Sequence, residues 1–294
     1  MRALILSGGS NKGALQVGAL RALVEKGITF DMVIGVSIGS LNGAYYAYSP
    51  DMEGVKKLEE IWLNVKRKDI FREGRIKAFF RFIRNAESLF SSDAFYKFLL
   101  KVAPARTFGE LKLDFYVPAL DIDSYDVFVF GENKDDSLID ALMASSALPP
   151  YFPPWRYKGR RLIDGGFVSN LPYRIALEKG AKEIYALHIV GRGHIDEKVS
   201  GLFGIIAKAM DYLINLKIEE NERLLEERKD VIVHYIRLEP ESPVSIFDFS
   251  RTPQLIERGY EITKYFLEHE EVPRRIGFIT RLKNLIPFLQ EHRH

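Results

Sequence analysis

The sequence predicts an α/β protein with a mainly parallel central sheet, and three observations support this prediction. Near the N-terminus the pattern runs strand, turn, helix, strand, turn, helix, which opens a parallel sheet with helices on its faces. The predicted strands are short apolar runs, and the first ends in a run of small residues. The chain has 294 residues, near the upper end for one hydrophobic core, so we expect one domain with appended helices.

The two opening units are each a strand, a turn and a helix. Residues 2–6 form an apolar run that ends at glycines, and residues 13–26 place leucines and alanines at helical spacing before a glycine stop. A second apolar run covers 31–36, and the small residues of 38–48 indicate the next helix. Both turns therefore lie at the carboxyl ends of predicted strands.

The rest of the chain continues the same pattern without an internal repeat or a low-complexity linker. Further helices are expected over 55–103 (as a mostly helical region), 137–147, 170–179, 202–229 and 252–270, and further strands over 114–120, 125–130, 161–164, 183–190 and 231–238. We expect one α/β domain over residues 1–266, with a helical insertion at about 52–104, followed by a helical tail over 267–294.

Composition excludes several classes of function. The formal net charge is +2, too balanced to indicate nucleic-acid binding. The chain has no cysteine, which excludes disulfides, a thiolate nucleophile and cysteine-ligated metals. Its longest N-terminal apolar run is far shorter than a signal-peptide core, and no stretch approaches the roughly 20 apolar residues of a membrane span. We therefore expect a cytoplasmic protein.

One of the two turns has the form of a nucleophile elbow. Gly35-Val36-Ser37-Ile38-Gly39 is a G-x-S-x-G sequence between a predicted strand and a predicted helix. Glycines are needed there because the turn is tight and because strand and helix pass close to each other. The same residues also fit a glycine-rich turn with a solvent-facing serine, and the motif alone leaves both interpretations open.

The other turn is the glycine loop Gly8-Gly9-Ser10-Asn11-Lys12-Gly13. A glycine-rich loop before a helix can hold phosphate, but this one lacks the order of residues found in either common phosphate-binding motif. The alternative is an oxyanion hole, whose backbone N–H groups stabilise a tetrahedral intermediate. If the first two strands are neighbours, the loop lies beside Ser37, which favours the second interpretation. Lys12 either adds positive charge near the site or only caps and solvates the loop.

A serine nucleophile needs a base, and the histidines offer no recognisable motif for one. His188 and His234 lie inside predicted strands, where we expect core or edge roles. His194 follows a strand in a loop and is the one plausible histidine base. Asp164 is more suggestive, because it ends a predicted strand and two glycines follow it. We expect it at the sheet edge that also carries Ser37 and the glycine loop.

At this point the chain resembles the patatin-like phospholipase family, and in particular its compact bacterial members. The family has a glycine-rich loop, a G-x-S-x-G elbow and a D-G-G turn in that order, and these correspond to residues 8–13, 35–39 and 164–166. Similar stretches occur at 144–149, 152–154, 170–172 and 248–250, so the resemblance covers about residues 2–265. One departure is Ser10, which replaces the third glycine of the loop and adds a Cβ beside the expected oxyanion hole.

The resemblance implies a three-layer α/β/α fold and a serine acyl hydrolase that needs no cofactor or metal. Ser37 would be the nucleophile and Asp164 its base, acting on a lipid or another acyl ester. Backbone N–H groups of Gly8, Gly9, Ser10 and Asn11 would form the oxyanion hole, and the supporting residues would be Lys12, Gly13, Gly35, Gly39, Gly165 and Gly166. Asp121 and Asp123 are interpreted as turn carboxylates, since no cluster of oxygen ligands for calcium is evident.

Two alternatives to this function stay open. The first is an acyl hydrolase or acyltransferase that uses the same elbow with an essential histidine. The second is a regulatory protein that keeps the fold without turnover, for which Ser10 is the supporting feature.

Two segments, 71–84 and 273–290, combine basic and aromatic or aliphatic residues. They fit peripheral contact with a membrane surface, and equally a helical cap whose apolar side chains pack on the core.

Overall fold

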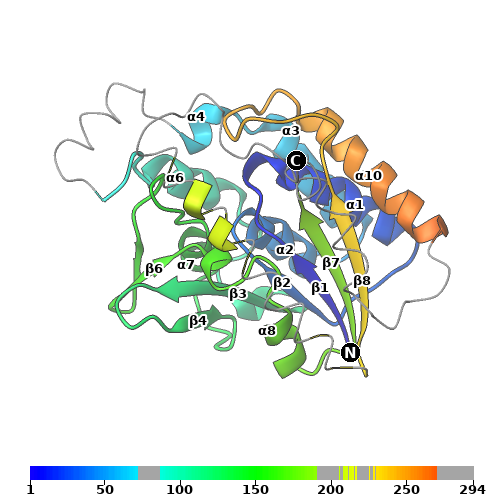
Figure 1. Cartoon of the computed structure of the whole chain (residues 1–294), viewed down its shortest axis with the longest axis horizontal. Helices are drawn as coiled ribbons and strands as arrows, with labels where there is room; N and C mark the ends of the chain where they lie inside the picture. Colours follow the sequence, from blue (N-terminus) through cyan, green and yellow to red (C-terminus); the bar gives the residue numbers. More distant parts are fainter. Residues whose placement is uncertain are drawn as a thin grey trace, which may run out of the picture.

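The computed structural model describes residues 1–71, 87–190 and 230–269, together with isolated residues between 205 and 228. In this part of the chain, eight strands form one mixed sheet in the order β5-β6-β3-β2-β1-β7-β8, with β4 paired to β3 (Figure 1). The parallel strands are β1 (Arg2–Leu6), β2 (Met32–Gly35), β3 (Asp114–Asp121), β7 (Glu183–Ile189) and β8 (Ile232–Leu238). The antiparallel ones are β4 (Val127–Phe130), β5 (Trp155–Tyr157) and β6 (Arg160–Ile163).

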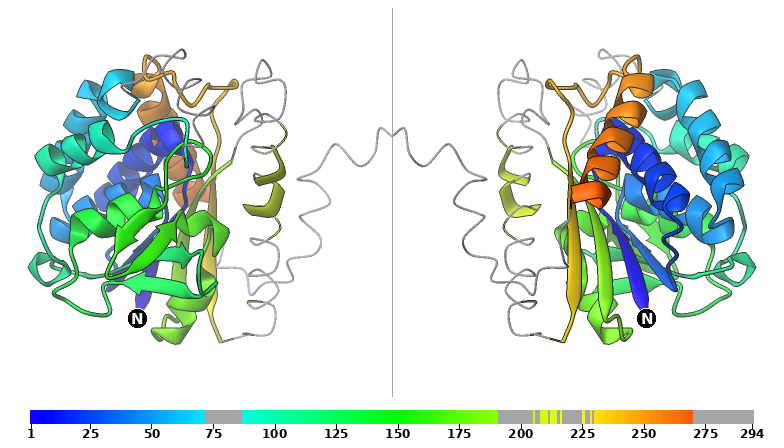
Figure 2. Two further views of the ribbon diagram at one scale, coloured as in Figure 1. Left: turned by 90° about the vertical axis from the view of Figure 1, so that its left-hand side faces the viewer. Right: turned by 90° about the vertical axis from the view of Figure 1, so that its right-hand side faces the viewer.

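Helices cover both faces of the sheet. They are α1 (Ala14–Glu25), α2 (Ile38–Tyr48), α3 (Met52–Asn64), α4 (Arg67–Ile70), α6 (Asp93–Val102), α7 (Leu138–Ser145), α8 (Tyr173–Glu178) and α10 (Thr252–His269), with short 3₁₀ turns η1 (Ser10–Gly13), η2 (Phe108–Glu110) and η3 (Gly165–Phe167). Along β1 the side chains alternate. Leu4 and Leu6 join the larger core under α1, α2, α3 and α10, and Ala3 and Ile5 join a smaller core with α8. This gives the expected three layers, and Figure 2 shows the larger helical layer on one side of the sheet.

The first and last described helices pack at a pair of glycines. A Cβ built on Gly18 of α1 would lie 1.8 Å from the carbonyl oxygen of Ile256, and one on Gly259 of α10 would lie 1.9 Å from that of Leu15. The backbones of α1 and α10 are therefore in direct contact, and they run side by side in Figure 1.

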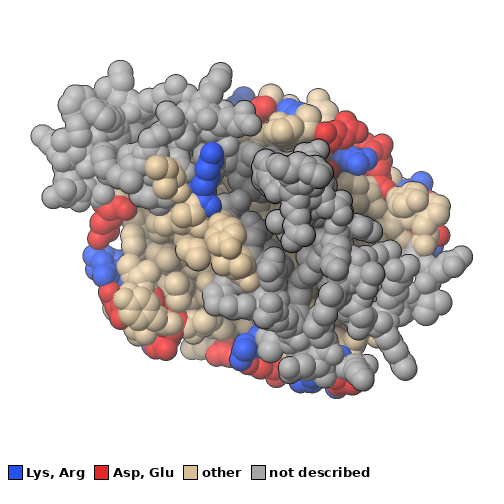
Figure 3. Space-filling model, in the orientation of Figure 1, with Lys and Arg blue, Asp and Glu red and all other residues tan. Residues whose placement is uncertain are grey.

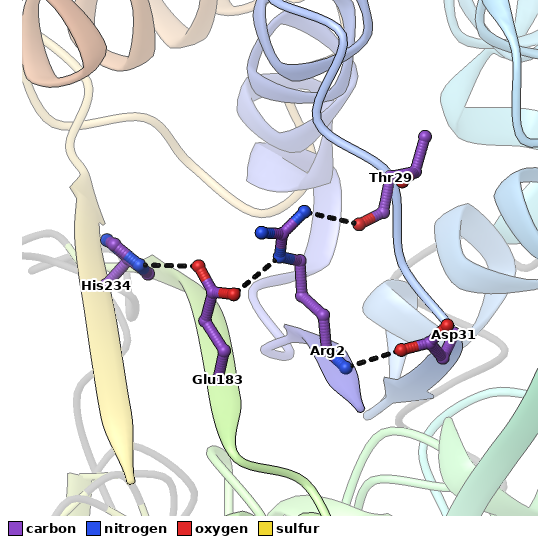
Figure 4. Close-up of polar contacts among 5 residues, drawn as sticks. All are labelled: Arg2, Thr29, Asp31, Glu183 and His234. Carbon is purple, nitrogen blue, oxygen red and sulfur yellow. Dashed lines mark hydrogen bonds and ion pairs between the residues drawn. The ribbon is translucent and has the colours of Figure 1, made fainter.

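A network of polar contacts lies at the end of the sheet where the parallel strands begin (Figure 4). Arg2 Nε donates to Glu183 Oε2 over 2.8 Å, and His234 Nε2 lies 3.1 Å from the other oxygen of Glu183. The backbone N–H of Arg2 donates to Asp31, and its guanidinium donates to the carbonyl oxygen of Thr29. These contacts join β1, β7, β8 and the segment before β2. His234 thus has the structural role expected for a strand histidine.

Most expected elements are present, and the differences are local. The short strand β5 was not expected, and β6 runs antiparallel to β3. Helix α10 runs to His269, close to the end expected for it, and residues from 270 onward lie outside the described residues. Most of the helix expected at 202–229 also lies outside them. On the face drawn in Figure 3, the described charged side chains gather near the outline of the molecule.

Candidate active site

The G-x-S-x-G segment forms a strained turn between β2 and α2. Ser37 has φ 52° and ψ −125°, a backbone conformation that L-residues rarely adopt. Neighbouring backbone leaves no room for a side chain at either glycine. A Cβ on Gly35 would lie 2.5 Å from Ser40 Cα, and one on Gly39 would lie 2.3 Å from the carbonyl oxygen of Leu6. The turn is fixed further by the Ser37 N–H, which donates to Ser145 Oγ at 3.0 Å. The geometry is that of an elbow, as the sequence predicts.

The glycine loop lies beside this elbow because β1 and β2 are paired neighbours. A Cβ on Gly8 would lie 3.0 Å from the Cβ of Ser37, so the loop backbone passes directly over the serine. Ser10 has φ 55°, in the left-handed region that favours glycine. At the far end of the loop, a Cβ on Gly13 would lie 2.7 Å from the ring of Trp62.

The loop N–H groups differ in their availability. Gly8 N–H donates to Asn170 Oδ1 at 2.7 Å and is therefore engaged by the protein itself. Ser10 and Asn11 begin the turn η1, and Gly9 precedes it, so their N–H groups have no acceptor within that turn. Of the four N–H groups expected in the oxyanion hole, that of Gly8 thus has another partner, and the other three stand at the start of a helical turn.

Two further residues of the loop are buried and anchor it. The Asn11 amide donates to the carbonyl oxygens of Ser245, at 2.9 Å, and Asp248, which joins the loop to the segment before α10. Lys12 is only 2% exposed. It therefore does not solvate the loop, one of the two roles considered for it.

Asp164 reaches the site by a route that differs from the expected one. β2 pairs only with the first residues of β3, as far as Ile34 opposite Tyr116. β3 continues beyond the end of β2, and β6 pairs antiparallel with this extension. Asp164 follows β6 directly, so it arrives alongside β3 at the point where β2 ends. The expected proximity to Ser37 is present, although Asp164 follows an antiparallel strand.

The carboxyl of Asp164 is buried and interacts with the nucleophile candidate. It accepts the N–H of Gly166 at 2.7 Å, and it is hydrogen-bonded to the side chain of Ser37. Burial raises the pKa of Asp164 to about 6, although the bonds from Gly166 and Ser37 act in the opposite direction. Gly165 is packed as tightly as the elbow glycines, with a Cβ position 2.3 Å from the carbonyl oxygen of Pro118.

Ser37 and Asp164 open into a largely apolar cavity of about 510 Å³, which is within the usual range for small-molecule sites. Its walls come from the glycine loop, α2, the end of α3, α4, α6 and the segment after α7. Its apolar lining includes Ile38, Leu41, Ile61, Trp62, Val65, Ile70, Phe71, Phe95, Phe98, Leu148, Tyr151, Phe152 and Phe249. A cavity with this lining has room for an apolar group of a ligand beside Ser37.

His188 is the described histidine that lines this cavity. Its Nδ1 lies 2.6 Å from the hydroxyl of Tyr235, and the residue is only 6% exposed. His188 therefore lies in a strand, as expected, and also forms part of the cavity wall. His194, the other candidate base, lies outside the described residues.

Other sequence-based expectations concern metals and membranes. Within the described ranges, no group of three or more His, Asp or Glu side chains is arranged to hold a metal ion. No helix in the described part of the chain is long and apolar enough to span a bilayer. Of the segments expected to contact membranes, only Phe71 is described, and it packs with Phe90 and Phe152 in an aromatic cluster. The two segments otherwise lie outside the described residues.

Comparison with known proteins identifies the family. The family model described as "Patatin-like phospholipase" matches residues 4–177. The chain is 30% identical over 201 residues to human "Patatin-like phospholipase domain-containing protein 6", which covers 68% of this chain and 14% of that protein. It is 26% identical over 289 residues to "Lysophospholipase NTE1" of Mycosarcoma maydis, covering 90% of this chain and 14% of the relative. The chain thus spans a small part of the length of these relatives.

A solved structure supports the fold. The structure of VipD from Legionella pneumophila aligns with a TM-score of 0.51 at 17% identity, covering 91% of this chain and 66% of that one. At this identity the likeness concerns the fold alone. The family match over more than half of the sequence shows that the chain belongs to the patatin-like phospholipase family.

Proposed function

We propose that this protein is a serine acyl hydrolase that cleaves carboxylic esters of lipids with Ser37 as nucleophile and Asp164 as base. One observation carries the proposal. Ser37 stands on a strained elbow and is hydrogen-bonded to a buried carboxyl whose pKa is raised to about 6, at the base of an apolar cavity. This arrangement supports the proposal, because it brings a candidate nucleophile, a candidate base and a space for substrate together.

The chemistry is acyl transfer in two steps. Ser37 Oγ attacks the ester carbonyl while its proton passes to Asp164, and a tetrahedral oxyanion forms. The proton then goes to the leaving alcohol, which departs and leaves an acyl group on Ser37. Water attacks this acyl-enzyme with Asp164 again accepting a proton. That proton then passes to Ser37 Oγ as the bond from Oγ to the acyl group breaks, which releases the fatty acid and restores the serine hydroxyl. We assign the oxyanion to the N–H groups of Gly9, Ser10 and Asn11, because the N–H of Gly8 is held by Asn170.

A carboxylate is a weak base for serine, and burial compensates in part. A base works best when its pKa lies near the working pH, and the pKa of Asp164 is raised towards that range. The remaining rate must come largely from the oxyanion hole, where removal of one donor typically costs about 2.7–4 kcal/mol. This balance explains why the rigid loop and elbow matter as much as the base.

Labelling with a fluorophosphonate probe tests this proposal. We expect the wild-type protein to be labelled, Ser37→Ala to lose labelling, and Asp164→Asn to be labelled much more slowly. The substitution His188→Gln is the matched control, since it changes a buried polar residue of the same cavity. If labelling depended on His188 and not on Asp164, the histidine-dependent mechanism would replace the dyad. A wild-type protein that resists labelling while folded would support the regulatory alternative.

We further propose that the protein contacts a membrane surface through residues 71–84 and 273–290. Their basic and apolar residues suit a surface with anionic lipid, where each cation contributes about 1 kcal/mol. We expect the protein to float with vesicles that contain phosphatidylglycerol and not with purely zwitterionic ones. If the protein floated with neither kind of vesicle, the result would favour the interpretation of these segments as a helical cap.

A further inference from the structure

Three polar side chains are buried directly beneath the glycine loop, and none of them lies within the segments 8–13, 35–39 and 164–166 described above. Gln16 of α1 and Asn42 of α2 are fully buried, and Trp62 of α3 is 3% exposed. Burying amides and an indole N–H in an apolar core is unfavourable unless they are hydrogen-bonded. We therefore expect these three side chains beside the proposed oxyanion loop to be hydrogen-bonded.

The three side chains form one chain of hydrogen bonds. The indole N–H of Trp62 donates to Asn42 Oδ1 at 2.8 Å. Asn42 Nδ2 donates to Gln16 Oε1 at 2.9 Å and to the carbonyl oxygen of Gly13 at 3.0 Å. Gln16 Nε2 donates to the carbonyl oxygens of Ser7, at 2.8 Å, and Leu187, at 3.3 Å. Both N–H bonds of each amide are used and both amide oxygens accept, so the network is fully satisfied.

This network holds both ends of the glycine loop. Gln16 binds the carbonyl oxygen of Ser7, where the loop leaves β1, and Asn42 binds that of Gly13, where it enters α1. The Ser7 hydroxyl adds a further link, because it donates to the Gly8 carbonyl oxygen and accepts the N–H of Ile189 on β7. Hydrogen bonds therefore hold the loop at its two ends, Ser7 and Gly13. The positions of these ends determine the direction in which the N–H groups between them point.

The same network reaches the cavity wall. The Trp62 ring lines the cavity and lies against Gly13, and its N–H ends the hydrogen-bond chain. An acyl chain in the cavity would therefore contact a side chain that is bonded, through Asn42, to the loop that would hold its carbonyl oxygen.

We propose that Gln16 and Asn42 are positioning residues that fix the oxyanion loop, with Trp62 linking that loop to the acyl-binding wall; this inference rests on the proposed function. The loop N–H groups stabilise negative charge that exists only in the transition state and tetrahedral intermediate. Loosening the loop should therefore lower kcat and leave KM nearly unchanged. A displacement of about 1 Å can lower a rate by about a hundredfold.

Steady-state kinetics on a soluble short-chain ester tests the proposal with Gln16→Met and Asn42→Leu, which keep approximate size and remove the hydrogen bonds. We expect kcat to fall at least about tenfold in each, with KM within about twofold. Trp62→Phe keeps both bonds to the loop backbone and should lower kcat less. If Asn42→Leu does not fold, Asn42→Asp replaces it, since it still accepts from Trp62 but loses its amide donors.

A second measurement separates positioning from general destabilisation. A trifluoromethyl ketone forms a tetrahedral oxyanion with an active serine, whereas the matching ether analogue only occupies the cavity. We expect the variants to lose ketone affinity in proportion to kcat/KM and to keep their affinity for the ether. The control is Val233→Ala in the core on the other face of the sheet, which should lower the melting temperature without changing kcat.

Three results would overturn the inference: an unchanged kcat in the folded variants, a change in KM alone, or an equal loss of kcat in Val233→Ala. These outcomes are distinct from failure of the proposed function. In that case the wild-type protein itself would show no turnover that depends on Ser37.

Discussion

At the scale of single residues, the candidate site contains one carboxyl whose burial disfavours its ionised form. Asp164 is buried among apolar and backbone groups, and its pKa is raised to about 6 by that burial. The raised pKa of Asp164 should affect two properties of the protein: how its reaction rate depends on pH, and how its stability depends on pH. The two are predicted in opposite directions, because the proposed mechanism needs the ionised form of Asp164, whereas burial makes that form unfavourable for folding.

The first prediction concerns the rate. Asp164 accepts a proton only when ionised, so kcat/KM should fall about tenfold per pH unit below about pH 6 and be level above it. A histidine base would give a similar curve, so the profile must be measured on His188→Gln as well. We expect that variant to keep the inflection near pH 6. Loss of the inflection in His188→Gln would contradict the assignment of Asp164 as the base.

The second prediction concerns stability. The pKa of Asp164 rises from 3.8 to about 6 on folding, so the unfolded chain ionises first and stability falls as pH rises between these values. A shift of about two units corresponds to about 3 kcal/mol at most. Asp164→Asn should therefore be inactive but more stable than the wild type by about 1–3 kcal/mol at pH 8. Urea denaturation at pH 8 and near pH 4 should show this gain disappearing at the lower pH. A gain that is equal at both would contradict the burial argument.

The sequence marks the two residues proposed to react, and it does not mark the residues that support them. Ser37 and Asp164 stand in short motifs whose glycines are demanded by local backbone geometry, so pattern and chemistry coincide. Asn170, which holds Gly8, lies 162 positions further along the chain. Gln16 and Asn42 look like ordinary polar residues on two helices. Nothing local marks such a residue as buried, because its burial depends on which helices come to pack together.

At the scale of elements, the contact between α1 and α10 reverses the usual rule for glycine in helices. Replacing a helical glycine with alanine normally stabilises a helix by roughly 0.5–1 kcal/mol. At Gly18 and Gly259 the added Cβ would stand within 2 Å of a backbone oxygen on the other helix. Since backbone cannot be moved aside as a side chain can, the two helices must separate.

The third prediction follows from this contact. Gly18→Ala and Gly259→Ala should each destabilise the protein by about 2–4 kcal/mol, as overpacking of a tight interface does. Thermal denaturation followed by circular dichroism measures the effect. Gly109→Ala is the control, because the nearest atom to its Cβ position is 3.4 Å away and little change is expected there. A stabilised Gly18→Ala would mean that the helices can separate at no cost.

The strands were predicted better than their directions. β1, β2, β3, β7 and β8 are apolar runs long enough to be recognised, and alternation with helices predicts that they are parallel. β5 has only three residues, too few to show a period. β6 precedes Asp164 as expected, but its antiparallel pairing with β3 depends on the length by which β3 exceeds β2, which no local pattern encodes.

At the scale of the whole molecule, the cavity is a joint product of the sheet edge and several helices. Val65 stands at the end of α3 with its side chain in the cavity wall, whereas Leu63 on the same helix is 49% exposed and is not part of that wall. A larger side chain at Val65 would reduce the cavity volume without changing the groups at Ser37, and the same change at Leu63 would leave the volume unchanged.

The fourth prediction uses this pair. Val65→Trp should fill part of the cavity and reduce kcat/KM for long-chain esters by about tenfold or more, since each buried methylene contributes about 0.8 kcal/mol. Short-chain esters should be affected much less. Leu63→Trp is the control and should leave the chain-length profile unchanged. Kinetics on a series of p-nitrophenyl esters measures both. An equal loss on short and long chains in Val65→Trp would mean that the acyl chain lies elsewhere.

The pairing of α1 with α10 also bears on how the protein is made. β1 lies in the middle of the sheet, and its neighbour β7 begins 181 positions after it. The glycine face of α1 is covered only by a helix that begins at Thr252. During synthesis, one edge of β1 and the side of α1 that carries Gly18 therefore stay uncovered until β7 and α10 have been made. Such distant pairings slow folding, and apolar surface that stays uncovered in this way favours aggregation of the incomplete chain.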